Sequence, residues 1–535
     1  MAAQANEETK SGSESIIDSR PDLYLALVCA AGTDLAEVKQ QIKAQLAVVN
    51  YRCEHLKVSA HISTVLGIAA SDDYFDNTVA LMGGGDILRQ NSKDGDGVAS
   101  LIVTAIRSKR PDNDRSSATA FLIDSLKNPK EVDVLDQIYA RNFYTISVYS
   151  PLNIRRENLA NKIARSRHEP IDNHHWAQAD KLISKDEKGF GDTGQSVRDT
   201  FPKADFFIDT ELDISGQIRR FIELVFGEPF TTPTIDEYMM FVAKATALRS
   251  CDLSRQVGAV IADKDGSIVA TGCNEVPIPK GGFFYEGRID SIDDNRDKVE
   301  QHDPNFHEIK RSISELIDVM KSAGIIDSPS SSSELAESLI HGEHKDLTSE
   351  ARIRNLIEFG RVVHAEMHAI TQAAMLGRSI NGSVLYCTTY PCHICARHII
   401  SAGISEVVYI EPYPKSLTAN LYHREIAAES EGDDTIENDK RVIFRTFRGI
   451  SPTLYQRVFG FRRRKDTYGA ITEWSPDSAE PVGAASGVAR RQFEQFVASG
   501  LETVLTKIHK IETSSQGESA DDGERSERTT SEGQG

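Results

Sequence analysis

The chain has 535 residues, enough for two or three domains with separate cores. Its 61 Lys and Arg against 80 Asp and Glu give a net charge of −19, which argues against a surface that tracks a polynucleotide. Seven cysteines without a regular framework indicate a reducing compartment. The polar start, and the lack of any apolar run of about 18 residues, predict a cytoplasmic protein without a membrane span.

The first half of the chain alternates strand and helix patterns. After residues 1–20, which are polar and expected to be disordered, Leu23–Cys29 is an apolar run typical of a strand, and an amphipathic helix pattern follows up to Leu46. Further strands are predicted at 118–123 and 143–149, with a helix at 129–139 between them. This repetition predicts an α/β domain with a mostly parallel sheet over residues 21–225.

The turn after the first strand is a candidate nucleotide-binding site, with Gly32, Thr33 and Asp124 as its candidate residues. A phosphate-binding P-loop reads Gly-x-x-x-x-Gly-Lys-Ser/Thr, so that backbone amides and the Lys hold phosphate. Here Gly32 is followed by Thr33 and Asp34, and both the Lys and the metal-binding hydroxyl are missing. We therefore expect a degenerate nucleotide fold used for sensing, regulation or assembly. For Asp124, which could act as a magnesium-binding acid, a solvated carboxylate is the alternative.

A second α/β domain is predicted over residues 235–470, with an insertion at about 278–355. Its predicted elements are a helix at 238–249, a hairpin of strands at 257–263 and 267–271, a strand at 383–386, a helix at 392–402 and a strand at 406–410. The Ser-rich stretch 327–350 of the insertion is expected to be a flexible surface excursion. A C-terminal helical extension at 471–512 and a disordered tail at 513–535 complete the expected organisation.

The motifs His364-Ala365-Glu366 and Pro391-Cys392-His393-Ile394-Cys395 carry the chemistry of the second domain. His364, Cys392 and Cys395 supply three zinc ligands and leave a fourth position for water, while Glu366 is free to move protons. A Cys-x-x-Cys pair just after a Pro is typical of a helix N-terminus, where the helix dipole favours thiolates. Zn²⁺ is therefore the expected cofactor.

Other interpretations of these residues remain open. A redox cysteine pair, a structural zinc site, or a two-His metal site formed by His364 and His368 would each account for part of the pattern. His302, His307, His341 and His344 of the insertion are candidates for a second zinc site, with scattered surface histidines as the alternative.

Asn274 and Arg255 are the candidate substrate-binding residues. Asn274 follows a predicted strand and comes shortly before Pro277, so its amide is placed to bind a sugar hydroxyl or a base edge. Capping of its own backbone in an Asx-turn is the alternative. Arg255 is a candidate phosphate ligand, and a solvated or ion-paired Arg is the alternative.

Together these motifs resemble the deoxycytidylate deaminase group of the zinc-dependent cytidine deaminase superfamily. The segments 125–132, 194–201 and 411–416 also resemble bacterial anti-phage dCTP deaminases. The resemblance implies an N-terminal P-loop-kinase-like parallel-sheet domain and a C-terminal cytidine-deaminase-like α/β/α sandwich. It places Asn274 against the substrate sugar and Arg255 near its phosphate.

By the same resemblance the reaction is hydrolysis of dCTP or dCMP to the uracil nucleotide, which depletes deoxycytidine nucleotides during phage infection. Homo-oligomers are expected, and a regulatory nucleotide such as dTTP and a repressor RNA or protein are candidate partners. Two other functions stay open. One is a polynucleotide-editing deaminase, which needs a basic, aromatic-lined channel; the other is a nucleotide-sensing regulatory protein with a structural zinc.

Overall fold

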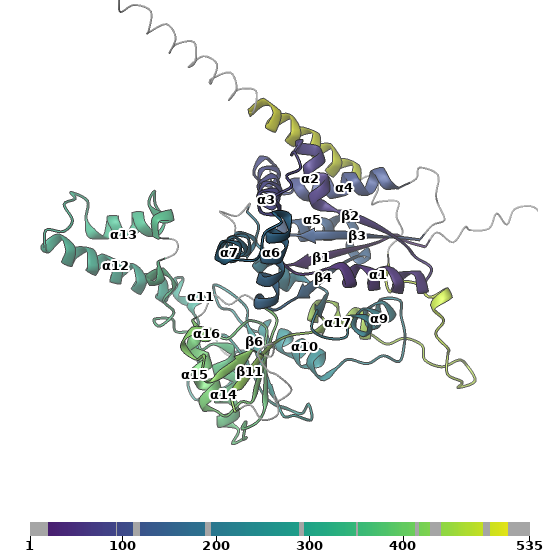
Figure 1. Cartoon of the computed structure of the whole chain (residues 1–535). Helices are drawn as coiled ribbons and strands as arrows, with labels where there is room; N and C mark the ends of the chain where they lie inside the picture. Colours follow the sequence, from purple (N-terminus) through teal and green to yellow (C-terminus); the bar gives the residue numbers. More distant parts are fainter. Residues whose placement is uncertain are drawn as a thin grey trace, which may run out of the picture. The chain divides into compact units, whose positions relative to one another are not determined.

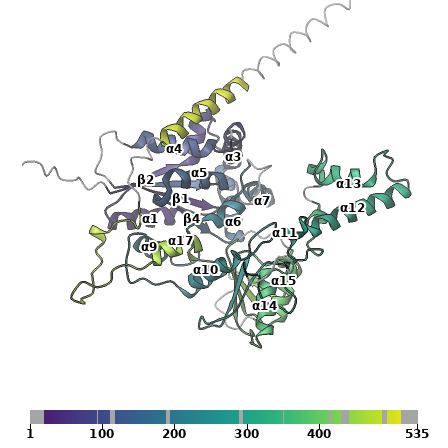
Figure 2. The ribbon, with the colours of Figure 1, turned by 180° about the vertical axis from the view of Figure 1, so that it is seen from behind.

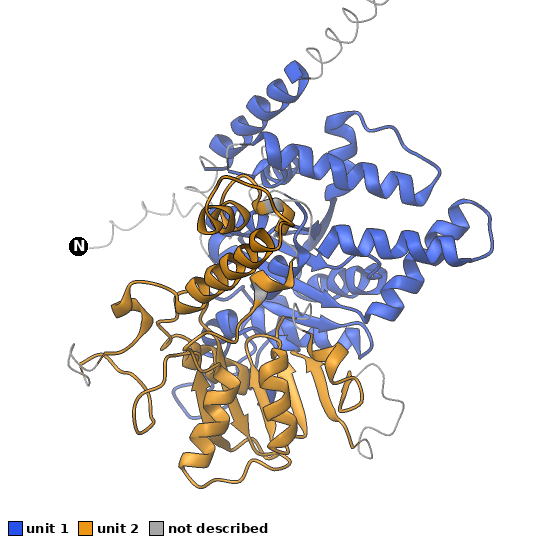
Figure 3. Cartoon of the chain, turned by 90° about the vertical axis from the view of Figure 1, so that its left-hand side faces the viewer, with its two compact units in different colours: residues 1–237, 448–535 blue, residues 238–447 orange. Residues whose placement is uncertain are grey.

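The computed structural model describes residues 20–92, 94–110, 118–187, 194–287, 294–348, 351–411, 417–428, 440–484 and 493–511. The expected disorder of 1–19 and 513–535, and residues 412–416 of one family-like segment, lie outside the described residues. The chain divides into two compact units, Met1–Glu237 with Arg448–Gly535, and Tyr238–Phe447 (Figure 3). Both are mixed α/β structures with a mostly parallel sheet, which confirms the predicted class.

The first unit contains a six-stranded sheet in the order β12-β5-β4-β1-β3-β2. All neighbouring pairs are parallel except β12 with β5. Its strands are β1 (Leu23–Cys29), β2 (Arg52–Lys57), β3 (Thr119–Leu126), β4 (Phe143–Tyr149), β5 (Phe206–Asp209) and β12 (Gly449–Ile450). Its helices are α1 (Ala36–Val48), α2 (Val58–Leu66), α3 (Tyr74–Asn91), α4 (Gly97–Lys109), α5 (Pro129–Tyr139), α6 (Leu152–Ser166), α7 (Asn173–Glu187), α8 (Val197–Thr200), α9 (Ile214–Val225) and α17 (Pro452–Phe459), with a further helix at 493–511.

The central strand β1 is buried along its whole length, as its uninterrupted apolar sequence predicts for a strand covered on both faces. Figure 1 shows α1, α9 and α17 on one side of the sheet and α4 and α5 on the other. The core on the first side combines apolar residues of the strands with Val38, Ile42 and Leu46 of α1 at helical spacing. The predicted strands at 118–123 and 143–149 and the predicted helix at 129–139 are confirmed.

The chain returns to the first unit after Phe447, earlier than the boundary at 470 expected from the sequence. The short strand β12 pairs with β5, and Ser451 donates its backbone N–H to the carbonyl of Asp205 (2.9 Å). Helix α17 then packs its buried residues Leu454 and Val458 into the core of the first unit. Strand β12 has only two residues, so its sequence pattern cannot show which of the two sheets it joins.

The second unit contains a six-stranded sheet in the order β10-β11-β9-β8-β6-β7. Strand β6 is antiparallel to both β7 and β8, and the remaining pairs are parallel. Its strands are β6 (Gly258–Ala262), β7 (Ile268–Cys273), β8 (Val384–Cys387), β9 (Glu406–Tyr409), β10 (Ile426–Ala428) and β11 (Val442–Thr446). Its helices are α10 (Ile235–Ala247), which begins just before the unit, α11 (Asp297–Glu300), α12 (Pro304–Ser322), α13 (Ser332–Ile340), α14 (Ala365–Met375), α15 (His393–Ser401) and α16 (Thr418–Leu421). The predicted hairpin at 257–271 is confirmed as β6 and β7.

Two glycines let helices approach this sheet closely. A Cβ at Gly272 would lie 2.1 Å from the carbonyl oxygen of Ala365, and one at Gly258 would lie 1.9 Å from that of Ala243. No side chain fits at these distances, so glycine is needed where α14 packs on β7 and α10 packs on β6. The small residues Ala365, Ala369 and Ala373 of α14 complete this close contact.

The insertion contains a helical hairpin of α12 and α13, visible from behind in Figure 2. Its small core joins Ile309, Ile313 and Ile317 of α12 to Ala336 and Ile340 of α13. The expectation of a flexible excursion over 327–350 is therefore wrong for the stretch 332–340. The Ser-rich composition favoured a loop, but the stretch begins with a capping box that starts a helix. Ser331 accepts a hydrogen bond from the backbone N–H of Glu334, and the Glu334 side chain accepts one from the backbone N–H of Ser331.

None of the helices in the described part of the chain is both long enough and apolar enough to cross a membrane. All seven cysteines lie in described segments and none forms a disulfide.

Candidate metal centre and its surroundings

The candidate metal ligands lie at the starts of two helices on one face of the second sheet. His364 is the N-cap residue of α14, and Cys392 is the N-cap residue of α15, one turn before Cys395. The Sγ of Cys392 accepts a hydrogen bond from the backbone N–H of Cys395 (3.5 Å). The predicted placement of the Cys-x-x-Cys pair at a helix N-terminus is confirmed.

The three side chains converge on one point. The Nδ1 atom of His364 lies 3.3 Å from the Sγ of Cys392 and 3.4 Å from the Sγ of Cys395. Tetrahedral coordination with ordinary Zn–N and Zn–S bond lengths puts nitrogen and sulfur about 3.6 Å apart. These distances and the nitrogen-and-two-sulfur donor set fit zinc. Among the described residues, they form the sole group of at least three His, Cys, Asp or Glu side chains able to hold a metal.

Hydrogen bonds among His364, Cys392 and Cys395 change the pKa of each side chain. The hydrogen bond to Cys392 raises the pKa of His364 to about 9, against the opposing effect of burial. The hydrogen bond from Cys395, and then the one with His364, lower the pKa of the Cys392 thiol to about 4. The hydrogen bond to Cys392, followed by burial, raises the pKa of Cys395. Zinc ligands are thiolates and neutral imidazole, so metal binding at this site is coupled to proton release.

Glu366 lies two residues after His364, in the first turn of α14, and is only 3% exposed. Burial is the largest cause that raises the pKa of its carboxyl, followed by the charge of Cys392. A carboxyl that binds protons more readily than usual, close to the ligand thiols, is suited to accept and return a proton.

The two-His alternative is not what the structure shows. His368 lies one turn after His364, but its Nδ1 is 2.8 Å from the carbonyl oxygen of Cys273 and its Nε2 is 3.3 Å from that of Gly282. Its ring also packs on Phe283, with ring centroids 4.6 Å apart. His368 therefore holds the loop after β7 against α14.

The histidines of the insertion do not form a second metal group in the described residues. The rings of His302 and His307 lie 5.0 Å apart, and the Nδ1 of His302 contacts the carbonyl oxygen of Glu300. His341 packs on Phe306 instead. His344 lies beside the Glu343 carboxylate.

Asn274 is buried and holds the loop that precedes β6. Its Oδ1 accepts from the N–H of Val257 (2.7 Å), and its Nδ2 donates to the carbonyl of Arg255 (2.8 Å). The amide thus binds backbone far away in sequence, and not its own turn. The Arg255 side chain is exposed and lies 3.6 Å from the Glu411 carboxylate, a weak ion pair at a surface.

The neighbouring Glu275 is not among the site residues predicted from the sequence. Its buried carboxylate accepts hydrogen bonds from the backbone N–H groups of Cys251 and Val276. An acidic residue placed between Asn274 and an apolar Val276-Pro277 pair is the signal that could have singled it out.

In the first unit, Gly32, Thr33 and Asp124 lie at the carboxyl ends of β1 and β3. Gly32 has a φ of +90°, and the hydroxyl of Thr33 is buried without a hydrogen-bond partner. Asp124 forms an ion pair with Lys39 (2.8 Å). Their role in nucleotide binding stays a prediction.

The backbone around this turn already has acceptors. The N–H of Ala31 donates to the buried Asp186 carboxylate (2.6 Å), whose other oxygen pairs with Lys127 (2.9 Å). The N–H of Ala36 donates to Asp34 (3.0 Å). A carboxylate therefore occupies amides that a phosphate-binding loop would direct at its ligand.

Two of the segments that carry the resemblance contact each other in this unit. The backbone N–H of Ser196 donates to the carbonyl of Lys127 (2.7 Å), and the Asn128 amide donates to the carbonyl of Gly194 (2.8 Å). The shared segments 125–132 and 194–201 thus build one local structure after β3.

Comparison with known proteins matches residues 233–411 to the cytidine and deoxycytidylate deaminase zinc-binding region. A deoxycytidylate deaminase of Enterobacteria phage T2 is 33% identical over 166 residues, which are 30% of this chain and 72% of the phage protein. The corresponding enzyme of phage T4 is 42% identical over 74 residues, 14% of this chain and 35% of that protein. The crystal structure of a dCMP deaminase from cyanophage S-TIM5 is 20% identical, covers 40% of this chain and 99% of its own, and has a TM-score of 0.19. The matched region includes all three candidate ligands and Glu366.

Proposed function

Because this chain belongs to the cytidine and deoxycytidylate deaminase family, we propose that it removes the amino group of free deoxycytidine nucleotides, dCTP and dCMP, by hydrolysis, to give uracil nucleotides and ammonia. The observation that carries the proposal is the convergence of His364, Cys392 and Cys395 beside the buried carboxyl of Glu366. A donor set of three with one open position is the arrangement that zinc enzymes use for hydrolysis.

In the proposed reaction, His364, Cys392 and Cys395 hold the zinc ion. The chemistry that zinc supplies when bound is Lewis acidity, which lowers the pKa of water toward about 7. Glu366 takes one proton from the attacking water and delivers it to the ring nitrogen N3, where it stays in the product; it then takes the second proton from the new C4 hydroxyl and passes it to the departing amino group. The C4–N bond breaks, the C4–O bond becomes the carbonyl of uracil, and the second proton leaves on ammonia.

The choice of a free nucleotide as substrate rests on charge and on the relatives. The net charge of −19 disfavours a polynucleotide track, whereas one nucleotide needs only a few local contacts. The phage relatives are deoxycytidylate deaminases, and deoxycytidylate is a single nucleotide. In this proposal the loop 250–257 borders the substrate, with Arg255 near its phosphate and Asn274 beside its sugar.

The biological role we propose is depletion of deoxycytidine nucleotides during phage infection. The support is the resemblance of the segments 125–132 and 194–201 to anti-phage dCTP deaminases. The first unit would then control the activity, as a P-loop-kinase-like domain in which Asp186 fills part of the phosphate-binding turn. Infected cells that carry Glu366→Gln are expected to keep their dCTP and lose protection.

A substrate panel tests the proposal. Zinc-loaded protein is incubated with dCMP, dCTP, their ribonucleotide counterparts and single-stranded DNA, and uracil formation is followed by chromatography. We expect uracil from dCTP or dCMP and none from DNA. Uracil in DNA alone, or no product from any free nucleotide, would refute the proposal.

A further inference from the structure

Glu275 lies two residues after the end of β7 and carries a buried carboxylate, only 4% exposed. Its Oε2 accepts a hydrogen bond from the N–H of Cys251 (2.8 Å), at the start of the loop 250–257. Its Oε1 accepts from the N–H of Val276 (3.0 Å). Both carboxylate oxygens are thus used to fix backbone.

The main chain of Glu275 contacts the other side of the site. Its N–H donates to the carbonyl of Val363 (3.2 Å), and the N–H of Val363 donates to the carbonyl of Glu275 (2.9 Å). Val363 immediately precedes His364. Glu275 therefore joins the start of the loop 250–257 to the residue that leads into the metal ligand, while Asn274 fixes the end of the same loop.

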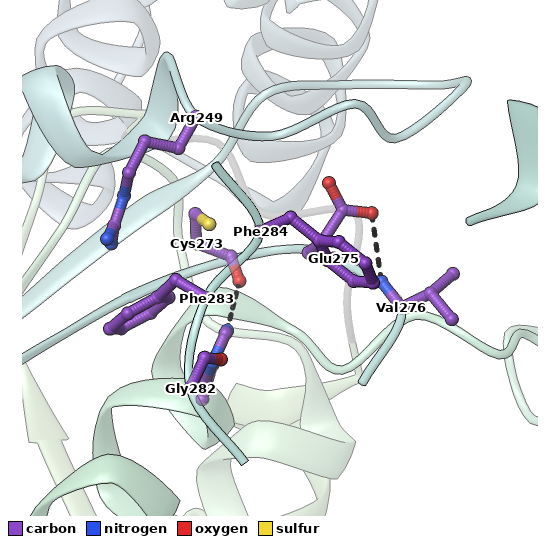
Figure 4. A pocket seen from close by; sticks show the side chains of 8 residues that line it. Arg249, Cys273, Glu275, Val276, Gly282, Phe283 and Phe284 are labelled. Carbon is purple, nitrogen blue, oxygen red and sulfur yellow. Dashed lines mark hydrogen bonds between the residues drawn. The ribbon is translucent and has the colours of Figure 1, made fainter. Parts of the chain in front are cut away.

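Glu275 lies beside one small cavity, which Arg249 and Phe283 also line (Figure 4). The volume of the cavity is about 10 Å³. The Arg249 guanidinium lies 3.8 Å from the Phe283 ring centroid and donates to the hydroxyl of Tyr285, but its Nε and Nη2 are buried without a partner. A cavity of this size has room for about one water molecule.

We propose that Glu275 is a positioning residue that orders the loop 250–257 for substrate binding. The proposal rests on the proposed function, in which this loop borders the nucleotide. In this role the Glu275 carboxylate does not contact the substrate. It holds the backbone of Cys251, and so the start of the loop that leads to Arg255.

Two substitutions of Glu275 should weaken the hold on the loop 250–257 to different degrees. Glu275→Gln keeps one carbonyl oxygen, which can accept from Cys251 or from Val276 but not from both, and it removes the charge. Glu275→Ala removes both acceptors and leaves the N–H of Cys251 unsatisfied. The exposed Glu425, in the same unit, offers the matched control Glu425→Gln.

The experiment measures KM and kcat for dCMP, zinc content, and hydrogen exchange of peptides covering 250–257, all on the full chain. For Glu275→Ala we expect a KM about tenfold higher, which is ~1.4 kcal/mol and the size of one hydrogen bond to a charged group. We expect kcat and zinc content to stay unchanged, faster exchange in 250–257, and intermediate values for Glu275→Gln. Glu425→Gln should match the wild type.

The outcomes separate this proposal from the proposed function. A wild type that deaminates no free nucleotide refutes the function, while exchange in 250–257 still tests the positioning role. If the wild type is active, and folded Glu275→Gln has the same KM and the same hydrogen exchange in 250–257 as the wild type, the positioning role is overturned. The role is also overturned if Glu275→Gln and Glu275→Ala lose equal activity, if this loss follows their lower thermal stability alone, and if the folded fraction has a normal KM.

Discussion

The Sγ of Cys392 lies 3.3 Å from the Nδ1 of His364, although 28 residues separate them in the chain. The fold brings them together because α14 and α15 begin at the same end of one sheet face, with Ala365 and Cys395 both buried in the same core. The packing of these helices therefore positions the candidate metal ligands.

Loss of a ligand is expected to remove the metal. His364→Ala and Cys392→Ala each leave two donors, so we expect zinc content to fall from one per chain to a small fraction, with loss of deamination. Cys251→Ser, which alters an exposed free cysteine outside the ligand group, is the control. Elemental analysis of the purified variants checks this. Full zinc content in both ligand variants would show that the ligand assignment is wrong.

Glu366→Gln is expected to separate chemistry from metal binding. The amide keeps the volume of the side chain but cannot carry a proton, so we expect kcat to fall by about 10²–10⁴-fold with zinc content unchanged. Steady-state kinetics and metal analysis on the same preparation make the measurement. Activity within a few fold of the wild type would exclude Glu366 as the proton carrier.

The pH dependence of stability should reveal Asp205 in the first unit. Burial is the main cause that raises the pKa of its carboxyl to about 6, against hydrogen bonds from Thr145 that lower it. Its pKa in the unfolded chain is about 3.9, so the folded state binds more protons between these values. This contribution to stability is fully present below about pH 4 and is lost as the pH rises through about 6.

Asp205→Asn removes that titration while keeping an acceptor for Thr145. Between about pH 4 and pH 7 the wild type should lose stability relative to Asp205→Asn, by about 2–3 kcal/mol. Denaturant unfolding of both proteins at several pH values measures the difference. A constant difference across this range would contradict the raised pKa.

The buried pair of Lys127 and Asp186 gives a second stability test. Asp186 is completely buried, so Asp186→Ala leaves the Lys127 ammonium without its partner and should destabilise the first unit by about 3–5 kcal/mol. The double variant Lys127→Met, Asp186→Leu removes both charges and is expected to be less destabilised than Asp186→Ala. Thermal unfolding measures both. A double variant less stable than the single one would show that the pair itself stabilises the fold.

The sequence predicted the strands and helices that carry strong local patterns. Three of these elements are determined by their own residues, and all three are confirmed: the strand Leu23–Cys29, the hairpin turn Asp263–Gly266 and the helix start at Pro391-Cys392. The three candidate metal ligands could be singled out as well, since their types and order are typical of one coordination chemistry, and the structure brings them together.

Other features depend on contacts that no local pattern contains. The return of the chain after Phe447 to pair β12 with β5, and the packing of α13 on α12, arise from tertiary contacts between short segments. The role of the Asn274 amide is also set by distant backbone, that of Arg255 and Val257. Such partners become visible only when the fold is known.

The release of ammonia from free nucleotides is the most direct test of the proposed deamination. Zinc-replete wild-type protein is mixed with dCMP and, separately, with dCTP in isotopically labelled water, and the ammonia and the label in the nucleotide are both measured. We expect one ammonia for each uracil nucleotide formed, with the labelled oxygen at C4 of the base, and about 10²–10⁴-fold slower formation of both products with Glu366→Gln. Fully zinc-loaded wild-type protein that releases no ammonia from either nucleotide would contradict the proposed deamination.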